Sequence, residues 1–253
     1  MPPFGPVHVL EPQAPHTHTI IFLHGRGSTG EDTAFDETMP AWFQAHSLTD
    51  VTARQDLQMI GIRESVRYLT RLLDEETEKL GGAADRVLLG GISQGAAVGL
   101  WTLLCAGEST AAGRLGGFVG ASTWLPFAEN LERYLGGGEI RTKQDTTASN
   151  DAQVSKADAF VEAMTASARG VLPDQRGSSE PALHSVPVFL AHGTDDAYVD
   201  IELGRQAAHV LRKVGLKTEW REYSGADQEG HWLKEPEEFD DIVRFLESTS
   251  ASI

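Results

Sequence analysis

The 253-residue chain has one cysteine, few basic residues and no long apolar run. A single cysteine, Cys105, excludes an internal disulfide, and its apolar surroundings predict a buried thiol rather than a reactive one. Lys and Arg number 21 against 37 Asp and Glu, so the net charge is −16. This charge disfavours nucleic acids and anionic membrane surfaces as partners. No apolar run is long enough to span a membrane.

The amino-terminal residues lack the features of a leader sequence. Residues 1–6 contain no basic start and no apolar segment, so we expect no signal peptide and no stable membrane insertion. Neither asparagine, Asn130 or Asn150, stands in a glycosylation sequon. Together with the single cysteine, these absences predict a cytoplasmic protein.

The chain does contain a regular alternation of strand-like and helix-like segments. Short apolar runs predict strands at residues 7–10, 17–23, 86–90, 115–121, 186–191 and 217–223. Helical spacing predicts helices at residues 57–80, 96–105, 153–169 and 201–214, and a last helix with Phe239, Ile242, Val243 and Leu246 on its apolar face. This alternation predicts one α/β domain over residues 1–253, with a mostly parallel sheet covered on both faces.

Residues 136–185 interrupt this alternation. They are rich in Gly, Ser, Thr and charged residues, and one helical pattern lies within them. We interpret them as a solvated surface insertion, with a lid over a site as the alternative, because long irregular segments serve either purpose.

The pentapeptide at residues 91–95, Gly-Ile-Ser-Gln-Gly, joins a strand to a helix of small residues. A serine with glycines two positions away on both sides is typical of a sharp strand-to-helix turn that exposes a nucleophilic hydroxyl. The helix would also direct free N–H groups towards negative charge formed beside the serine. The pattern Gly-x-Ser-x-Gly also occurs by chance. The interpretation of Ser93 as a nucleophile therefore requires an acid and a histidine further along the chain.

Two later strand ends carry such groups. Asp195 and Asp196 follow the strand at 186–191, and His231 follows the strand at 217–223. The carboxyl ends of parallel strands meet at one edge of a sheet, and the order Ser, Asp, His is that of α/β-hydrolases. The imidazole would activate the hydroxyl, and a carboxylate would orient the imidazole. The alternatives are a solvated turn carboxylate, which describes at least one of the two aspartates, and a surface-loop histidine.

Three other histidines fit structural roles. His209 lies within a predicted helix instead of a loop after a strand. His24 and His192 each precede a glycine at a strand end, and we interpret both as packed, hydrogen-bonded residues. No set of carboxylates or cysteines accompanies them at metal-site spacing, so we expect no metal site.

The glycine-rich loop at residues 24–30 follows the strand at 17–23 and lacks the Lys-Ser/Thr ending of a phosphate loop. Attack of a serine on a carbonyl creates an oxyanion, which requires backbone N–H donors. We expect these donors at Gln94, next after the nucleophile, and at Arg26 in this loop.

Several segments together resemble the phospholipase/carboxylesterase family, which includes the acyl-protein thioesterases, in a fungal-like form. They are residues 20–30 (IIFLHGRGSTG), 39–43 (MPAWF), 89–95 (LGGISQG), 124–126 (WLP), 190–199 (LAHGTDDAYV) and 230–231 (GH). The resemblance extends over most of the chain outside residues 136–185. It implies an α/β-hydrolase fold, no cofactor, and hydrolysis of carboxylic esters or thioesters of acyl chains.

The resemblance also implies roles for individual residues. Ser93 would be the nucleophile and His231 the base. Asp196 would be the acid, because it fits the pattern D-x-x-V and Asp195 does not. The oxyanion hole would consist of the backbone amides of Arg26 and Gln94, and the wall of the acyl-chain channel would contain Trp124, Leu125 and Pro126.

The chain departs from the family pattern at three places. Arg26 stands where Leu is common, and Ala197 and Asp200 replace prolines near the acid. The passage from Gly30 to Met39 is too short for the further parallel strand of the family, since a parallel crossover needs about a dozen residues. We therefore expect the sheet to lack one strand between these two residues.

These patterns predict a serine hydrolase of the acyl-protein thioesterase or carboxylesterase type, working through an acyl-enzyme on Ser93. A short-chain carboxylesterase or lysophospholipase is the alternative within this class, and a non-catalytic hydrolase scaffold that binds a ligand or protein is the alternative outside it. The expected partners are acyl esters or thioesters, S-acylated proteins included. We expect a monomer or a weak homodimer.

Overall fold

A computed structural model describes residues 4, 7–27, 41–47, 50–106, 110–135, 148–166 and 186–250, with backbone alone at 148–155 and 250. Its sheet contains five strands: β1 (Thr19–Leu23), β2 (Val87–Ile92), β3 (Gly117–Ala121), β4 (Val188–Gly193) and β5 (Thr218–Tyr223). All neighbouring strands are parallel, and their order in the sheet is their order in the chain. The predicted mostly parallel sheet is confirmed.

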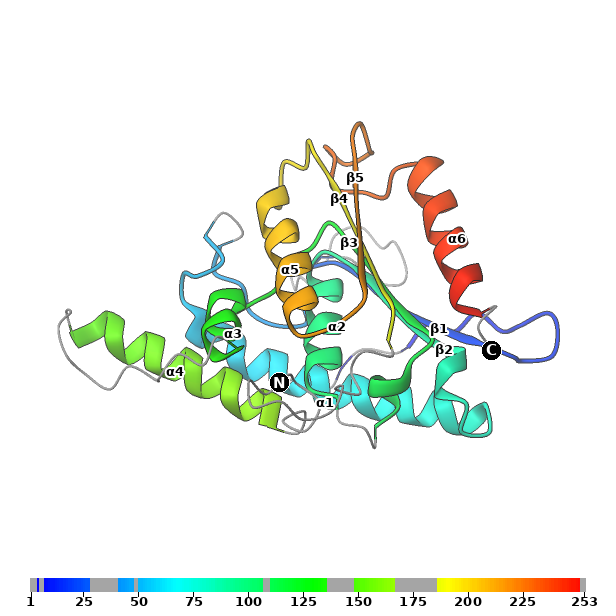
Figure 1. The fold of residues 1–253 in the computed structure, drawn as a ribbon, viewed down its shortest axis with the longest axis horizontal. Helices are drawn as coiled ribbons and strands as arrows, with labels where there is room; N and C mark the ends of the chain where they lie inside the picture. The colour runs from blue at the N-terminus through cyan, green and yellow to red at the C-terminus, as the bar shows by residue number, and fades with distance from the viewer. Residues whose placement is uncertain are drawn as a thin grey trace.

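Helices connect successive strands, as parallel pairing requires. They are α1 (Gln55–Lys79), α2 (Gln94–Leu104), α3 (Ala128–Leu135), α4 (Ala148–Thr165), α5 (Ile201–Lys213) and α6 (Glu237–Ser250), with short 3₁₀ helices η1 (Ala84–Arg86) and η2 (Ala111–Arg114). Helices α2 and α5 lie along one side of the sheet, with α1 beyond α2, and α6 lies on the other side (Figure 1). None of the described helices combines the length and apolar character needed to cross a membrane.

Helix α2 is the centre of the main core. Every residue from Gln94 to Leu104 is buried, because α2 is enclosed between the sheet and α1. Its small residues permit this close approach: a Cβ at Gly99 would lie 2.6 Å from the Phe118 ring of β3. The strands β2, β3 and β4 are buried along their whole lengths, as expected for parallel strands covered on both faces.

The amino-terminal edge strand expected at residues 7–10 is absent. These residues form no regular structure, and Leu10 is 86% exposed. An apolar run adopts a strand only where a neighbouring strand pairs with its backbone, and within the described residues β1 pairs with β2 alone. Exposed on β1 are Ile20 (61%) and Phe22 (52%). The strand expected to be missing between Gly30 and Met39 falls outside the described residues.

The prediction of which residues form the apolar face of the last helix is partly wrong. Phe239 and Val243 are 41% and 52% exposed, whereas Phe245 is buried and its ring lies 5.6 Å from that of Phe189. Among the described strands, α6 packs mainly against β3 and β4. The sheet therefore covers only a narrow stripe of this helix. Ile242 and Leu246 do pack against this cluster, as predicted.

Helix α4, in the middle of the expected insertion, belongs to the main core. Ala157, Phe160, Val161 and Met164 are buried, and the Phe160 ring lies 4.7 Å from that of Phe127. Helix α4 packs against α1 and α3, on the side of the molecule away from α6 (Figure 1). The interpretation as a solvated insertion is therefore wrong for the helix. Residues 136–147 and 167–185 lie outside the described residues.

Candidate active site

Ser93 occupies a tight turn between β2 and α2. Its backbone has φ 55° and ψ −123°, a conformation that non-glycine residues rarely adopt and that marks stored strain. The two neighbouring glycines make the turn possible, since a Cβ at Gly95 would lie 2.4 Å from the Leu23 carbonyl oxygen and one at Gly91 2.7 Å from the Ala96 nitrogen. Ser93 itself is 7% exposed. The turn has the geometry expected of a nucleophile elbow.

The end of β3 supports this turn. The Ser93 amide donates to the Ala121 carbonyl at 2.9 Å, and the Thr123 hydroxyl donates to the Ser93 carbonyl at 2.8 Å. Both bonds are buried, so each holds the strained backbone in a medium where an unpaired polar group would be costly. No sequence pattern assigned a role to Thr123; its place directly after a strand end was the available signal.

Asp196 and His231 are brought together by the ends of β4 and β5. The His231 Nδ1 atom lies 2.8 Å from Asp196 Oδ2. The other oxygen, Oδ1, accepts the amides of Tyr198 at 2.9 Å and Val199 at 3.0 Å. The Asp196 side chain is fully buried, while that of His231 is 15% exposed. The carboxylate is thus fixed, and the imidazole has limited access to solvent.

The Asp196 carboxylate is held in its charged form. Burial opposes its ionisation, but hydrogen bonds from two imidazoles and two backbone amides outweigh burial, and the pKa of Asp196 lies well below its usual range. The adjacent Asp195 has a different environment, since it is exposed and accepts the Gly225 amide at 2.9 Å. Of the two aspartates, Asp196 is therefore the one that contacts His231 in the described part of the chain.

The loop that carries His231 packs tightly on the end of β4. A Cβ at Gly193 would lie 2.1 Å from the Gly230 carbonyl oxygen, and Gly230 itself has φ +82°. The Ala197 amide donates to the Glu229 carbonyl at 3.0 Å. These contacts explain how the loop brings His231 to Asp196 and why glycines occupy both positions.

The three histidines expected to have structural roles each have a polar partner of their own. His209 is 60% exposed and lies 3.5 Å from Glu132. His24 Nδ1 is 2.7 Å from the Gly25 carbonyl oxygen. His192 is buried and hydrogen-bonded, as expected, but its Nε2 atom also lies 3.2 Å from Asp196 Oδ2. The sequence reasoning missed this second contact; the spacing of four residues along the strand end was the only signal.

The loop with Arg26 lies beside Ser93. A Cβ built on Gly25 would be 3.4 Å from the Ser93 Cβ, so the amide of Arg26 follows directly after a residue in contact with the elbow. The Trp42 indole donates to the His24 carbonyl at 2.9 Å and restrains the start of this loop. The Arg26 guanidinium donates to the Ala45 carbonyl at 3.3 Å.

The side chain of Gln94 joins the elbow to the segment around Trp42. Its oxygen accepts the Trp42 amide at 2.9 Å, and its nitrogen donates to the Phe43 carbonyl at 2.8 Å. Gln94 is completely buried at the start of α2, where unpaired N–H groups are available. Sequence reasoning used only the amide of Gln94, because the partners of its side chain lie 51 and 52 positions away.

Known proteins are similar to this chain in sequence. The sequence model described as Phospholipase/Carboxylesterase matches residues 33–136. Acyl-protein thioesterase 1 of Yarrowia lipolytica is 28% identical over 279 aligned residues, which cover 98% of this chain and 98% of that protein. Acyl-protein thioesterase 1 of Gibberella zeae is 26% identical over 91% of this chain and 90% of that protein.

The chain is thus similar to the phospholipase/carboxylesterase family. Solved structures agree with the fold of this family. Acyl-protein thioesterase 2 of Zea mays is 21% identical with a TM-score of 0.63, over 97% of this chain and 99% of that chain. Arabidopsis thaliana SOBER1 is 19% identical with a TM-score of 0.59, over 92% and 98%. These likenesses confirm the expected α/β-hydrolase fold.

The segment expected to line an acyl-chain channel is packed into the core. Trp124 and Leu125 are 2% and 3% exposed, and the Trp124 ring meets that of Phe43 edge-on at 6.1 Å. The Pro126 carbonyl accepts the Trp101 indole at 3.1 Å. The segment lies next to Thr123, which contacts Ser93, so it borders the elbow. Its role in holding an acyl chain stays a prediction.

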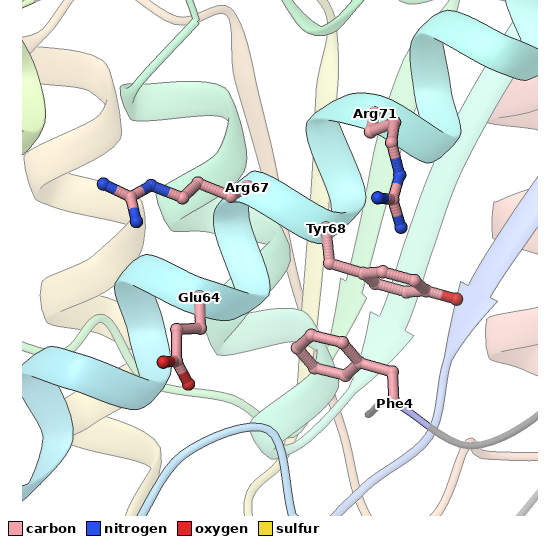
Figure 2. A pocket seen from close by; sticks show the side chains of 5 residues that line it. All are labelled: Phe4, Glu64, Arg67, Tyr68 and Arg71. Carbon is pink, nitrogen blue, oxygen red and sulfur yellow. The ribbon is translucent and has the colours of Figure 1, made fainter. Parts of the chain in front are cut away.

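A cavity of about 420 Å³ lies away from Ser93, Asp196 and His231, on the outer side of α1. Figure 2 shows that the rings of Phe4 and Tyr68 lie face to face, with Arg71 over Tyr68 and Arg67 directed away. One oxygen of Glu64 is buried there without a hydrogen-bond partner. None of the predicted site residues lines this cavity.

The described part of the chain contains neither a cluster of metal ligands nor a thiol with a lowered pKa. No group of three or more His, Cys, Asp or Glu residues there could hold a metal ion. Burial raises the pKa of the Cys105 thiol to about 12, so little of this thiol is ionised at neutral pH. Cys105 is only partly buried, at the end of α2, and its lack of reactivity stays a prediction.

Proposed function

We propose that this chain is a serine hydrolase that cleaves carboxylic esters or thioesters of acyl chains. The observation that carries the proposal is the 2.8 Å contact between His231 Nδ1 and the buried Asp196, on the sheet edge that also carries Ser93 in its strained turn. A buried carboxylate that fixes one imidazole nitrogen leaves the other, Nε2, free to act as a base.

In the proposed mechanism, His231 Nε2 removes the proton of the Ser93 hydroxyl as the Ser93 oxygen attacks the acyl carbonyl. The amides of Gln94 and Arg26 donate to the resulting oxyanion. Collapse of the tetrahedral intermediate breaks the bond to the alcohol or thiol, which leaves with the proton from His231. Water, activated by the same imidazole, then hydrolyses the acyl-enzyme and restores Ser93. No step requires a cofactor or metal ion.

The names of the relatives favour thioesters over other substrates. Both fungal relatives are named acyl-protein thioesterase 1, so S-acylated proteins in the cytoplasm are the proposed substrates. A short-chain carboxylesterase or lysophospholipase is the alternative, and Trp124, Leu125 and Pro126 would border the acyl chain in either case. Rates on short and long acyl esters and on an S-acylated peptide distinguish these substrates. The proposed assembly is a monomer or weak homodimer.

Labelling with a fluorophosphonate probe tests the proposed nucleophile. We expect the folded protein to be labelled at Ser93 and the Ser93→Ala variant to lose labelling and at least three orders of magnitude in turnover. The matched control is Ser122→Ala, a buried serine at the end of β3. A folded protein that never reacts with the probe would contradict the proposed hydrolase activity. The non-catalytic scaffold would then be the remaining candidate.

A further inference from the structure

A second histidine contacts the carboxylate oxygen that holds His231. His192 Nε2 lies 3.2 Å from Asp196 Oδ2 and 2.9 Å from the Val199 carbonyl oxygen. Both neighbours are acceptors, so Nε2 must carry the hydrogen and donate to both. The His192 side chain is fully buried, and its Nδ1 atom has no hydrogen-bond partner. Asp196 Oδ2 therefore accepts from two imidazoles at once.

The surroundings of His192 leave its ring little freedom. A Cβ at Gly204 of α5 would lie 2.5 Å from Nδ1, and the Trp220 ring lies 6.2 Å away, centroid to centroid. The polar groups that face the pair come from three elements: Glu222 on β5, Glu238 on α6, and Tyr198 with its partner Glu229 on the loops. Glu222 is already paired with Arg205, at 2.8 Å.

We infer that His192 is a positioning residue for catalysis: its Nε2–H fixes the rotamer of Asp196 and shares the negative charge of Oδ2. This inference rests on the proposed function. Without this donor, the whole charge of Oδ2 faces His231, and the buried carboxylate loses one of the bonds that favour its ionised form. The imidazolium of His231 would then be favoured over the neutral base, and the orientation of its ring would be less defined.

Two substitutions at position 192 separate the donor from the rest of the ring. The amide nitrogen of glutamine reaches the position of Nε2, whereas that of asparagine reaches only the position of Nδ1. We expect His192→Gln to retain most of the activity. We expect His192→Asn to lower kcat by about 10- to 100-fold with little change in KM, as misplacement of a catalytic group does. The acid limb of its kcat/KM profile should move to higher pH.

A third variant displaces His192 without altering it. Gly204→Ala would push a methyl group against Nδ1, and we expect the same fall in kcat and the same shift of the acid limb. The matched control is Ala208→Gly, which lowers stability at another buried position of the same helix. The His231 Nδ1 proton, followed by NMR, should shift in the Asn and Ala variants and stay unchanged in the control.

The outcomes distinguish this inference from the proposed function. Wild-type protein that neither turns over esters nor labels with the probe overturns both. Active wild-type protein with folded Asn and Ala variants of unchanged kcat and pH profile overturns the role of His192 alone. Equal losses in the Gln and Asn variants would show that His192 acts through packing instead of its donor. If the Asn variant does not fold, the Gly204→Ala profile decides.

Discussion

Single residues at the elbow combine strain with close contact. Ser93 has a positive φ although it carries a side chain, and its carbonyl and amide are both bonded to the end of β3. Such strain, of about 1–3 kcal/mol, persists only where the surrounding structure holds it. At Gly95 the limiting factor is space, because the backbone of β1 lies against its Cα.

Gly95→Ala should therefore destabilise the fold by about 1–3 kcal/mol and lower turnover, because the methyl group would displace the loop after β1. Urea unfolding followed by circular dichroism measures the first effect, and ester hydrolysis the second. The control is Gly81→Ala, which meets open space at φ +69° and should cost about 1 kcal/mol with full activity. Equal stability of both variants would contradict the crowding at Gly95.

Glu238 is an ionisable residue whose environment disfavours its charge. It is 3% exposed, and burial raises its pKa to about 7, although its carboxylate accepts the Lys234 amide at 2.8 Å. A carboxyl whose pKa is raised by folding contributes stability that is fully present below its unfolded pKa and is lost as the pH rises through the folded value. For Glu238 this window runs from about pH 4.5 to about pH 7.

Glu238→Gln should remove this loss of stability at rising pH, because the amide oxygen of glutamine can accept the Lys234 amide without carrying a charge. Above pH 7 the variant should be more stable than the wild type by up to about 3 kcal/mol, and below pH 4.5 the two should be equal. Chemical denaturation at pH 4, 6 and 8 measures the difference. Glu237→Gln, at an exposed neighbouring position, is the control. A constant difference across this range would contradict the raised pKa.

At the scale of elements, helix α4 shows why burial cannot be judged from composition. Its flanking residues are polar, yet Phe160 is 3% exposed and its ring meets those of Trp101 at 5.6 Å and Phe127 at 4.7 Å. The guanidinium of Arg63 on α1 lies 5.7 Å from the same ring. Helix α4 thus closes the core formed by α1, α2 and α3, and deleting it would expose this cluster.

Phe160→Ala should cost about 3–5 kcal/mol of folding free energy, the usual range for a buried phenylalanine. Lys156→Ala, on the exposed side of the same helix, should change stability by less than about 0.5 kcal/mol. Guanidinium denaturation of both variants measures these values. A Phe160→Ala variant as stable as the wild type would restore the interpretation of this region as a peripheral insertion.

At the scale of the whole molecule, the sheet ends in an apolar edge. Among the described residues, β1 pairs with β2 alone, and Ile20 and Phe22 point to the same exposed face. Unpaired edges with apolar side chains favour association between chains, and the net charge of −16 opposes it. Salt screens this repulsion, so association should increase with ionic strength.

The double variant Ile20→Thr and Phe22→Thr should reduce salt-induced association while changing stability little, because both side chains are mostly exposed and threonine favours strands. Light scattering between low and high salt measures association. Ile21→Thr is the control: Ile21 packs against the main core, so its replacement should destabilise the fold. Undiminished scattering from the double variant would exclude the β1 edge as the point of association.

The sequence by itself determined the features that depend on local pattern. The order of strands and helices and the glycines around Ser93 could be predicted because each depends on residues a few positions apart. The choice of Asp196 over Asp195 came only from the resemblance to a known family. The exposure of Phe239 and the burial of Phe160 could not, because an apolar residue is buried only where another element covers it. The same applies to residues 7–10, which lack a neighbouring strand.

Tertiary structure alone decided how the candidate site is held together. The bonds from Thr123 to Ser93, from Gln94 to Phe43 and from Trp42 to His24 join segments that are 18 to 51 positions apart. No local pattern encodes such pairs, since hydrogen bonding requires the fold to bring donor and acceptor within about 3 Å. Sequence could thus nominate the reacting groups, whereas packing determines which carboxylate oxygen His231 and His192 share.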